Sequence, residues 1–219
     1  MNAPLAERLK NETRALHTSA ERSVFMGALL RARLERPAYC ALLRNLHAVY
    51  AVLEPALERH AHRPTIAPIY LPSLWRARAL AHDLAALHGE HWANELVLQP
   101  AAMAYVERLR ELDVAKPDLL LAHAYVRYLG DLSGGQMLSD IVEKSLYRDG
   151  VAAVAFYDFG NALATKELTQ AFRAGLAVVP ADARQTDALV SEARLSFGLH
   201  QRLFDELAVA CAVVPSGEV

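Results

Sequence analysis

The sequence has few of the features that mark secreted, membrane-spanning or nucleic-acid-binding proteins. Its only two cysteines, Cys40 and Cys211, form no CxxC pair and have no metal-ligand spacing, which argues against a disulfide framework and a structural zinc site. The 23 basic and 25 acidic side chains nearly cancel to a net charge of −2, so no strong positive field is available to hold nucleic acid. No apolar run approaches the roughly 18 residues of a membrane span, and the opening stretch MNAPLAERLKNE does not resemble a signal peptide. We therefore expect a cytoplasmic protein without a membrane anchor.

The composition favours helix throughout the chain. Apolar residues make up 53% and charged residues 22%, the balance of a folded, soluble protein. Alanine and leucine, both strong helix formers, together occupy about a third of the positions, against only 10 glycines and 10 prolines. A chain of 219 residues is also of a size that one hydrophobic core can serve. We predict an all-α single domain over residues 1–219, with flexible ends at 1–4 and 213–219.

Apolar residues that recur at helical spacing place the individual helices. The predicted helices cover 5–20, 24–34, 37–57, 74–87, 101–112, 118–147 and 162–177, with a last helix capped by Asp182 or Thr186. Pro55 is expected to cap or kink the end of the third helix, and the three prolines in 60–72 predict an extended connector. The inward face of the last helix is expected to contain Leu189, Leu195, Phe197, Leu199, Leu203 and Leu207.

His17 is the first candidate for chemistry. It lies about 80° around the predicted helix from Leu9, so it borders the apolar stripe. Glu21, one turn later, can accept the Nδ1 proton and leave Nε2 free for a metal. Lys10 lies on nearly the same face and can meet an anionic group of a large ligand centred on His17. A hydrogen-bonded core histidine and a solvated lysine are the ordinary alternatives.

The stretch YVRYLGDLSGGQ, residues 125–136, is the most informative part of the chain. Gly130 and Gly134 share a helix face, with Gly135 beside them, although each glycine costs about 1 kcal/mol relative to alanine. A helix without Cβ atoms on one face lets a flat ligand lie against its backbone; close packing of two helices is the alternative. Arg127 and Asp131 form an i,i+4 pair next to this bare face, either as a surface salt bridge or as a buried pair with ordered water.

The segment LKNETRALHTSAE and above all RYLGDLSGGQ resemble the haem oxygenases, and the similarity extends over most of the chain. The resemblance implies an all-α fold that holds haem between a proximal first helix and a kinked, glycine-rich distal helix. It implies that His17 is the axial ligand of the iron and that Glu21 hydrogen-bonds to it. Gly130, Gly134 and Gly135 match the part of the distal helix that presses against the haem.

The same resemblance implies roles for residues elsewhere in the chain. Asp131 matches an aspartate that organises distal water beside bound O₂, and Arg127 and Tyr50 match members of its hydrogen-bond network. These three are the predicted catalytic residues. The further predicted haem contacts comprise propionate partners and pocket-lining side chains: Lys10, Tyr125 and Arg173 for the propionates, and Met26, Ser133, Phe197 and Phe204 for the pocket.

Two positions depart from the family pattern. Thr169 stands where many members have a lysine, with Lys166 seven residues before Arg173, which puts one propionate contact in doubt. His200 stands where several members have an asparagine, and it can add a polar contact or fill space. Because propionate anchors fix the rotation of the haem, the position of ring cleavage stays open.

The implied activity is the O₂- and electron-dependent cleavage of haem, as substrate and cofactor, to biliverdin, CO and ferrous iron. A non-catalytic haem carrier or sensor is the main alternative, and a cofactor-free helical interaction module is another. A di-iron carboxylate protein is disfavoured because no Glu-x-x-His tetrapeptide occurs. No flavin or dinucleotide fingerprint is visible, so we expect a separate ferredoxin or flavoprotein reductase to supply the electrons. We also expect a monomer. The predicted docking surface for that donor is Arg31, Arg33, Arg36, Arg76 and Arg78.

Overall fold

Helices form the whole architecture of the computed structural model, which describes residues 3–146 and 153–214. No strand occurs among these residues, so the predicted all-α fold is confirmed. The α-helices are α1 (Leu5–Glu21), α2 (Val24–Leu30), α3 (Arg36–Arg59), α4 (Ala77–His88), α5 (Trp92–Glu95), α6 (Pro100–Ala115), α7 (Leu120–Leu146), α8 (Ala162–Val178) and α9 (Ala183–Ala210). Short 3₁₀ helices join them: η1 (Ala67–Ile69), η2 (Pro72–Leu74), η3 (Pro117–Leu119) and η4 (Ala155–Tyr157). Residues 1–2 and 215–219 of the predicted flexible ends lie outside the described residues.

Local sequence signals explain where several helices begin. The Ser23 hydroxyl accepts a hydrogen bond from the Met26 N–H at the start of α2, and the side chain of Asn161 caps α8 in the same way. Asp182, one of the two predicted caps, accepts from the Gln185 N–H at 2.7 Å and begins α9. These side chains satisfy backbone donors that have no partner within the helix.

Several predicted boundaries are corrected by the structure. Helix α2 ends at Leu30 rather than at residue 34, and Ala32 then takes a left-handed φ of 56°. Helix α3 continues through Pro55 for another turn, because its packing against α4 and α6 outweighs one missing N–H donor. The stretch 60–72 folds into turns and η1 instead of the predicted extended connector. Leu195 is 43% exposed, since it lies about 130° from the centre of the buried face of α9.

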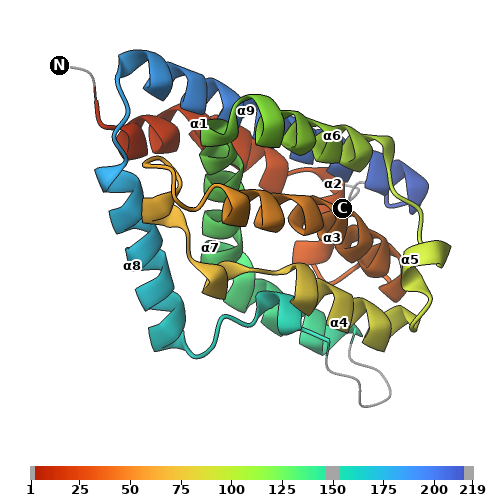
Figure 1. Cartoon of the computed structure of the whole chain (residues 1–219). Coiled ribbons are helices and arrows are strands. Elements are labelled where there is room, and N and C mark those ends of the chain that lie inside the picture. Colours follow the sequence, from red (N-terminus) through yellow and green to blue (C-terminus); the bar gives the residue numbers. More distant parts are fainter. Residues whose placement is uncertain (1–2, 147–152, 215–219) are drawn as a thin grey trace.

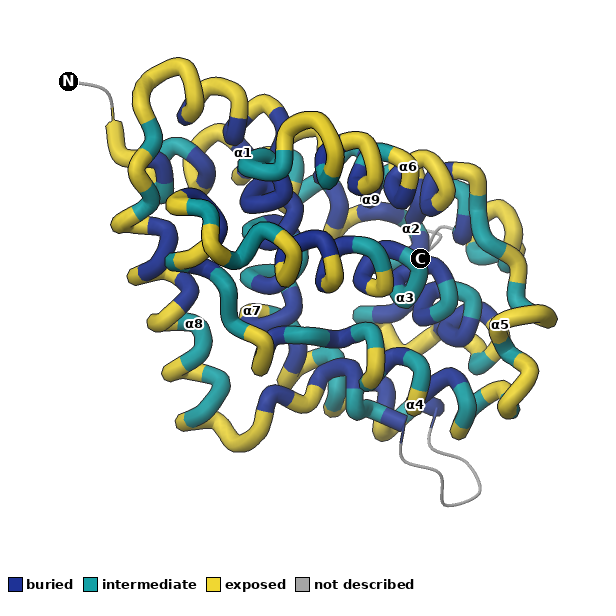
Figure 2. Tube along the Cα trace, in the orientation of Figure 1, coloured by how far each residue is buried: buried dark blue, intermediate teal, exposed yellow. Residues whose placement is uncertain are grey.

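Helix α7 crosses the middle of the molecule, and other helices cover it (Figure 1). It packs on α3, α9 and η4, while α9 also packs along α1, α2 and α6. Figure 2 shows buried positions on the inward sides of these helices and exposed positions on the outer sides of α6 and α8. The ribbon of α7 is continuous through its glycines and changes direction in its second half (Figure 1). The core therefore surrounds the segment that carries the RYLGDLSGGQ motif.

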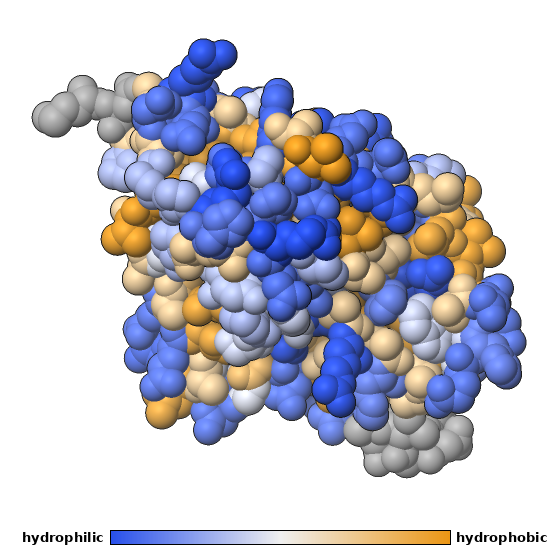
Figure 3. Space-filling view, viewed as in Figure 1, coloured by the Kyte–Doolittle hydropathy of each residue, from blue (hydrophilic) through white to orange (hydrophobic). Residues whose placement is uncertain are grey.

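The face seen in Figure 3 is mostly hydrophilic, with apolar side chains in separate small groups. Within the described part of the chain, no helix has the length and apolar character needed to cross a bilayer. Both cysteines are free thiols, as their isolated positions in the sequence predict.

Candidate active site

An open cleft with about 1080 Å³ of empty space lies between α1, α2, α7 and α9. A second space of about 1880 Å³ lies between α1, α7 and α8. Five side chains or backbone segments line both spaces: His17, Val126, Gly130, Ser133 and Phe197. The two spaces therefore adjoin and form one slot, which has an apolar inner end and a charged outer end.

His17 enters this slot from α1. Its side chain is 47% exposed, toward the cleft that it lines, and its Nδ1 atom lies 3.5 Å from Oε2 of Glu21. The Phe197 ring meets the imidazole edge-on, with the ring centroids 5.9 Å apart. Because Nδ1 faces the carboxylate, Nε2 is the nitrogen available to a ligand in the cleft. The structure thus brings together His17, Glu21 and Phe197 as the sequence analysis expected.

The glycines of α7 form the opposing wall. Among the described residues, a Cβ atom built on Gly130 would meet no atom within 4 Å, and one on Gly134 would meet only the side chain of Leu138. Open space, and not a neighbouring helix, therefore accounts for these two glycines. Gly135 is different, because its missing Cβ points at the backbone of Tyr157 in η4 and it lines neither part of the slot. The expected contact between Gly135 and haem is corrected accordingly.

The three predicted catalytic residues meet at the inner end of the cleft. The Arg127 guanidinium donates from Nε to the Tyr50 hydroxyl at 2.9 Å and from Nη2 to Oδ1 of Asp131 at 2.8 Å. The Tyr50 hydroxyl donates to the other carboxylate oxygen, Oδ2. Arg127 and Asp131 line the cleft, while Tyr50 is fully buried behind them. The i,i+4 pair is thus buried, which decides between the two alternatives that the sequence left open.

Burial dominates the electrostatics of this cluster. It raises the pKa of Asp131, an effect that the charge of Arg127 and the Tyr50 hydroxyl oppose. Burial lowers the pKa of Arg127, but Asp131 and Tyr50 outweigh it, so the net shift is upward and the guanidinium keeps its charge. The cluster therefore presents to the cleft a carboxylate whose charge is compensated from behind.

His200 completes this cluster. Its Nε2 accepts a 2.8 Å hydrogen bond from Nη1 of Arg127, and its Nδ1 lies 3.1 Å from the backbone oxygen of Ser196. It lines the cleft and is only 3% exposed. Burial and the nearby Arg127 charge lower its pKa well below 6.5. Of the two expectations for this position, the polar contact is the one that the structure contains.

Cationic side chains surround the outer end of the slot. Lys10 on α1 and Arg173 on α8 line it from two sides, together with Tyr125 of α7. Arg14 also lines it, and the sequence analysis missed this residue although it lies one turn after Lys10. Thr169 donates its hydroxyl proton to the Thr165 carbonyl, and neither Thr169 nor Lys166 is among the lining residues. Neither position therefore faces the end of the slot at which the family resemblance places the propionates.

The remaining predicted contacts also reach the cleft, since Met26, Ser133 and Phe204 all line it. Arg76, in contrast, does not belong to an exposed docking surface. It is 8% exposed, its guanidinium donates to backbone carbonyls such as that of Asp158 at 2.7 Å, and it stacks on the Phe159 ring at 4.0 Å. Its structural role in holding η4 explains this correction.

The slot fits haem in shape and chemistry. Its walls are mostly apolar, α1 offers an imidazole, α7 has two positions without side chains at Gly130 and Gly134, and cations stand where carboxylates would emerge. Among residues 3–146 and 153–214, no cluster of three or more His, Cys, Asp or Glu could hold a metal ion.

Known proteins are similar to this chain in sequence and in structure. The family model described as Heme oxygenase matches residues 3–206. Heme oxygenase 1 of the cyanobacterium Nostoc is 35% identical over 207 residues, which cover 94% of this chain and 87% of that protein. Heme oxygenase 1 of Homo sapiens is 36% identical over 209 residues, 94% of this chain and 73% of that protein.

Solved structures agree with the sequence comparisons. The structure of heme oxygenase-2 from Synechocystis in complex with heme and NO has a TM-score of 0.90 at 34% identity, covering 97% of this chain and 89% of that chain. Heme oxygenase-1 from the same cyanobacterium, in complex with heme, has a TM-score of 0.87 at 33% identity, covering 96% and 95%. The similarity therefore includes the whole slot and the helices that form it.

Proposed function

The chain belongs to the haem oxygenase family, and we propose that it binds haem in the slot between α1 and α7 and cleaves it to biliverdin, CO and ferrous iron. As a haem oxygenase it degrades haem, which is therefore both substrate and cofactor. The observation that supports this assignment of the slot is the placement of His17 and of the Arg127–Asp131 pair on opposite sides of one cleft that the bare face of α7 keeps open.

The proximal side of the proposed site leaves one nitrogen of His17, Nε2, available to the iron. Glu21 faces Nδ1 of His17, so Nε2 is the nitrogen that would hold the iron, and Phe197 restrains the imidazole from its edge. Bound haem supplies the iron at which O₂ is activated and the macrocycle that is oxidised. A neutral imidazole pushes less electron density toward the iron than a thiolate does, and neither free cysteine lines the slot.

The distal side holds water and protons. Each oxygen of Asp131 accepts one hydrogen bond from the protein and keeps a lone pair for water in the cleft. The carboxylate can therefore hold a water whose proton points toward the reacting centre, while Arg127 keeps the carboxylate in place. The backbone of α7 at Gly130 and Gly134 would limit the space above the haem macrocycle, and these two residues have no side chains that would fill that space. We assign Asp131 no contact with the iron.

The outer end of the slot orients the substrate. Lys10, Arg14 and Arg173 surround it, and these cations would hold the two propionates by charge-assisted hydrogen bonds, with Tyr125 as a further donor. The rotation of the haem that these cations select would determine which edge of the macrocycle faces Asp131. We further propose a cytoplasmic monomer that receives electrons from a separate ferredoxin or flavoprotein reductase.

Reconstitution with hemin tests this function against a haem carrier or sensor. We expect a one-to-one complex with a Soret band that decays when ascorbate or a reductase supplies electrons in air, and chromatography should then identify biliverdin. His17→Ala, the matched control, should weaken the complex and remove turnover. A Soret band that persists under reduction in air would support a carrier, and a cofactor-free interaction module would form no complex.

A further inference from the structure

The guanidinium of Arg127 uses all three of its nitrogens on three different partners. Nε and Nη2 donate to oxygens, on Tyr50 and Asp131, at 2.9 and 2.8 Å. Nη1 donates at 2.8 Å to a ring nitrogen, Nε2 of His200. A hydroxyl or carboxylate oxygen always has a lone pair to offer, but an imidazole nitrogen accepts only when it carries no proton. The third contact therefore depends on the protonation state of His200.

Two independent contacts determine that state. Arginine has only donors, so Nε2 of His200 must present its lone pair to Nη1. The carbonyl oxygen of Ser196, 3.1 Å from Nδ1, has only lone pairs, so Nδ1 must carry the hydrogen. Both contacts require the same neutral tautomer with the proton on Nδ1. Burial and the Arg127 charge favour the neutral ring as well, because they lower the pKa of His200.

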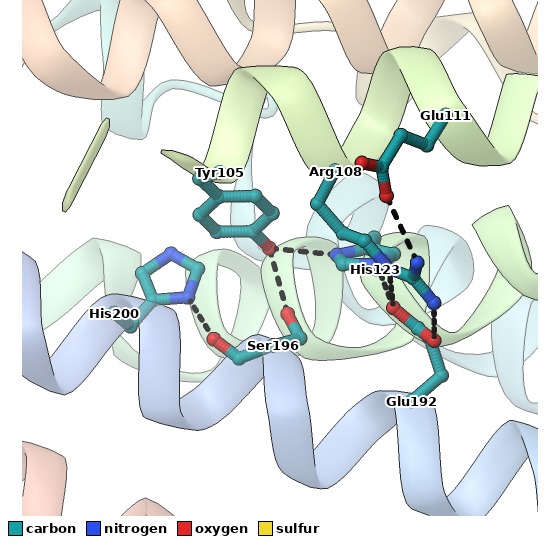
Figure 4. Close-up of polar contacts among 7 residues, drawn as sticks. All are labelled: Tyr105, Arg108, Glu111, His123, Glu192, Ser196 and His200. Atoms are coloured by element: carbon teal, nitrogen blue, oxygen red, sulfur yellow. Dashed lines mark hydrogen bonds and ion pairs between the residues drawn. The ribbon is translucent and has the colours of Figure 1, made fainter. Parts of the chain in front are cut away.

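A chain of polar groups holds the other side of the His200 ring (Figure 4). Tyr105 of α6 meets the ring at 90°, with centroids 5.0 Å apart, and hydrogen-bonds to the Ser196 hydroxyl at 2.7 Å. The chain continues from Tyr105 to Nδ1 of His123 at 3.1 Å, and from Nε2 of His123 to Glu192 at 3.1 Å. Arg108 closes it with two hydrogen bonds to Glu192. These contacts tie α6, α7 and α9 together around His200.

The groups that face His200 define its electrostatic surroundings. Arg127 and, farther away, His123 approach it from α7, the Tyr105 ring from α6, and Phe204 from its own helix α9. Asp131 lies behind Arg127 and is hydrogen-bonded to it. The nearest charge to the ring is thus positive. The Ser196 carbonyl, which favours a protonated ring, is outweighed by burial and by the Arg127 charge.

We infer that His200 is a positioning residue of the distal site: its neutral imidazole fixes the Arg127 guanidinium and, through it, the carboxylate of Asp131. The importance of this arrangement for turnover rests on the proposed function, whereas the tautomer does not. With Nδ1 committed to Ser196 and Nε2 committed to Arg127, His200 has no hydrogen-bonding atom left for water in the cleft. An asparagine amide, with two donors and an acceptor oxygen, would keep one. Ordering of distal water therefore falls to Asp131.

Nitrogen NMR of the haem-free protein, labelled at histidine and arginine with ¹⁵N, tests the tautomer directly. We expect His200 to show a protonated Nδ1 and an unprotonated Nε2, and to stay neutral at pH values where the exposed histidines have become charged. The Nε–H signal of Arg127 should be protected from exchange. A ring protonated at Nε2, or one that titrates together with the exposed histidines, would overturn the inference without bearing on haem degradation.

Two variants then connect the contact to turnover. His200→Leu removes the acceptor; we expect loss of Arg127 Nε–H protection and a fall in kcat of roughly tenfold or more, as for a misplaced catalytic group, with hemin affinity kept within about twofold. His200→Asn restores an acceptor and should recover most of both signals. If His200→Leu keeps the Arg127 protection and the turnover of a wild-type protein that does degrade haem, the positioning role fails. If the wild type itself does not degrade haem, the proposed function fails and the NMR result still decides the role of His200.

Discussion

Arg127 and Asp131 lie one turn apart on α7 and share a 2.8 Å hydrogen bond, with 11% and 7% of their side-chain surfaces exposed. At a surface such an i,i+4 pair stabilises a protein by less than about 1 kcal/mol. In a buried site, loss of one partner leaves an unpaired charge, at a cost of roughly 3–5 kcal/mol. The pair therefore links the stability of the haem-free protein to the geometry of the proposed distal site.

Asp131→Asn should separate these two contributions. The amide keeps an acceptor oxygen for Arg127 but cannot hold water by two carboxylate oxygens, so we expect a normal Soret band on hemin binding and little or no biliverdin. Asp131→Ala should give the same spectrum and loss of product. Both variants remove the charge that faces Arg127, and Asp131→Ala should have the lower thermal unfolding midpoint because it loses the hydrogen bond as well. Spectra, pigment chromatography and calorimetry on the three proteins measure this, and undiminished turnover in Asp131→Asn would contradict the assigned role.

Gly130→Ala tests whether the bare face of α7 serves the ligand. A Cβ there meets no atom within 4 Å of the haem-free fold, so we expect the variant to be more stable by up to about 1 kcal/mol through helix propensity, yet to bind hemin more weakly. Gly198→Ala is the matched control, because Gly198 lies inside α9, has equally open space and lines neither part of the slot. Equal hemin affinities for the two variants would mean that α7 does not contact the haem.

Arg173→Glu tests the proposed propionate end. Reversing a charge that lines the outer slot should lower hemin affinity and alter the ratio of biliverdin isomers, since a propionate would lose its partner. Lys166→Glu makes the same charge change on the exposed surface of the same helix, at a position that does not line the slot. We expect it to leave both quantities unchanged. A similar loss in both variants would indicate a general electrostatic effect and not a propionate contact.

Local spacing was enough to find those parts of the site that lie on a single helix. The spacing from Leu9 to His17 placed His17 at the border of the apolar stripe of the first helix, and the glycine spacing in α7 indicated a bare face. The pairing of Tyr50 with Asp131 joins residues 81 positions apart, and no periodicity contains such a contact, so only the family resemblance supplied it.

The corrected predictions also concern contacts between separate elements, which the periodicity of a single helix does not contain. Gly135 shares the motif with Gly130 but points toward η4, because successive helix positions differ by about 100°. Arg76 reads as a surface residue by type, yet the carbonyls of η4 and of the following turn surround it. The contact of His200 with Arg127 depends on how α7 and α9 cross, which sequence alone does not fix.

Gly175→Ala should be among the most destabilising single-methyl changes in the described chain. A Cβ at this position of α8 would overlap the carbonyl oxygen of Pro68, which is rigid backbone within η1. We expect the free energy of unfolding to fall by about 1–3 kcal/mol or more, whereas Gly198→Ala should raise it. Denaturant titrations of the wild type, Gly175→Ala and Gly198→Ala measure these changes in the free energy of unfolding. Because Arg173 lies two residues earlier on α8, hemin affinity should fall as well; a variant as stable as the wild type would show that α8 can move away from η1 freely.

The buried carboxyl group of Glu54 makes a pH-dependent contribution to the free energy of unfolding. At neutral pH this contribution disfavours the folded state. Its buried carboxyl accepts hydrogen bonds from the backbone N–H groups of Arg76 and Ala77 at the start of α4, yet burial raises its pKa to about 7 from 4.5. Between these values the folded state binds more protons than the unfolded state, so this group's contribution to stability falls as pH rises from about 4.5 through 7.

Glu54→Gln removes this titration while keeping an acceptor oxygen. The free energy of unfolding of the variant minus that of the wild type should therefore increase between pH 4.5 and pH 8, by on the order of 3 kcal/mol. Glu58→Gln, one turn later on the exposed side of α3, is the matched control for the removal of one carboxyl group from this helix. The other titrating groups cancel in each difference. Parallel curves for the wild type and Glu54→Gln would mean that Glu54 stays ionised in the folded protein and that the backbone donors of α4 fully offset its burial.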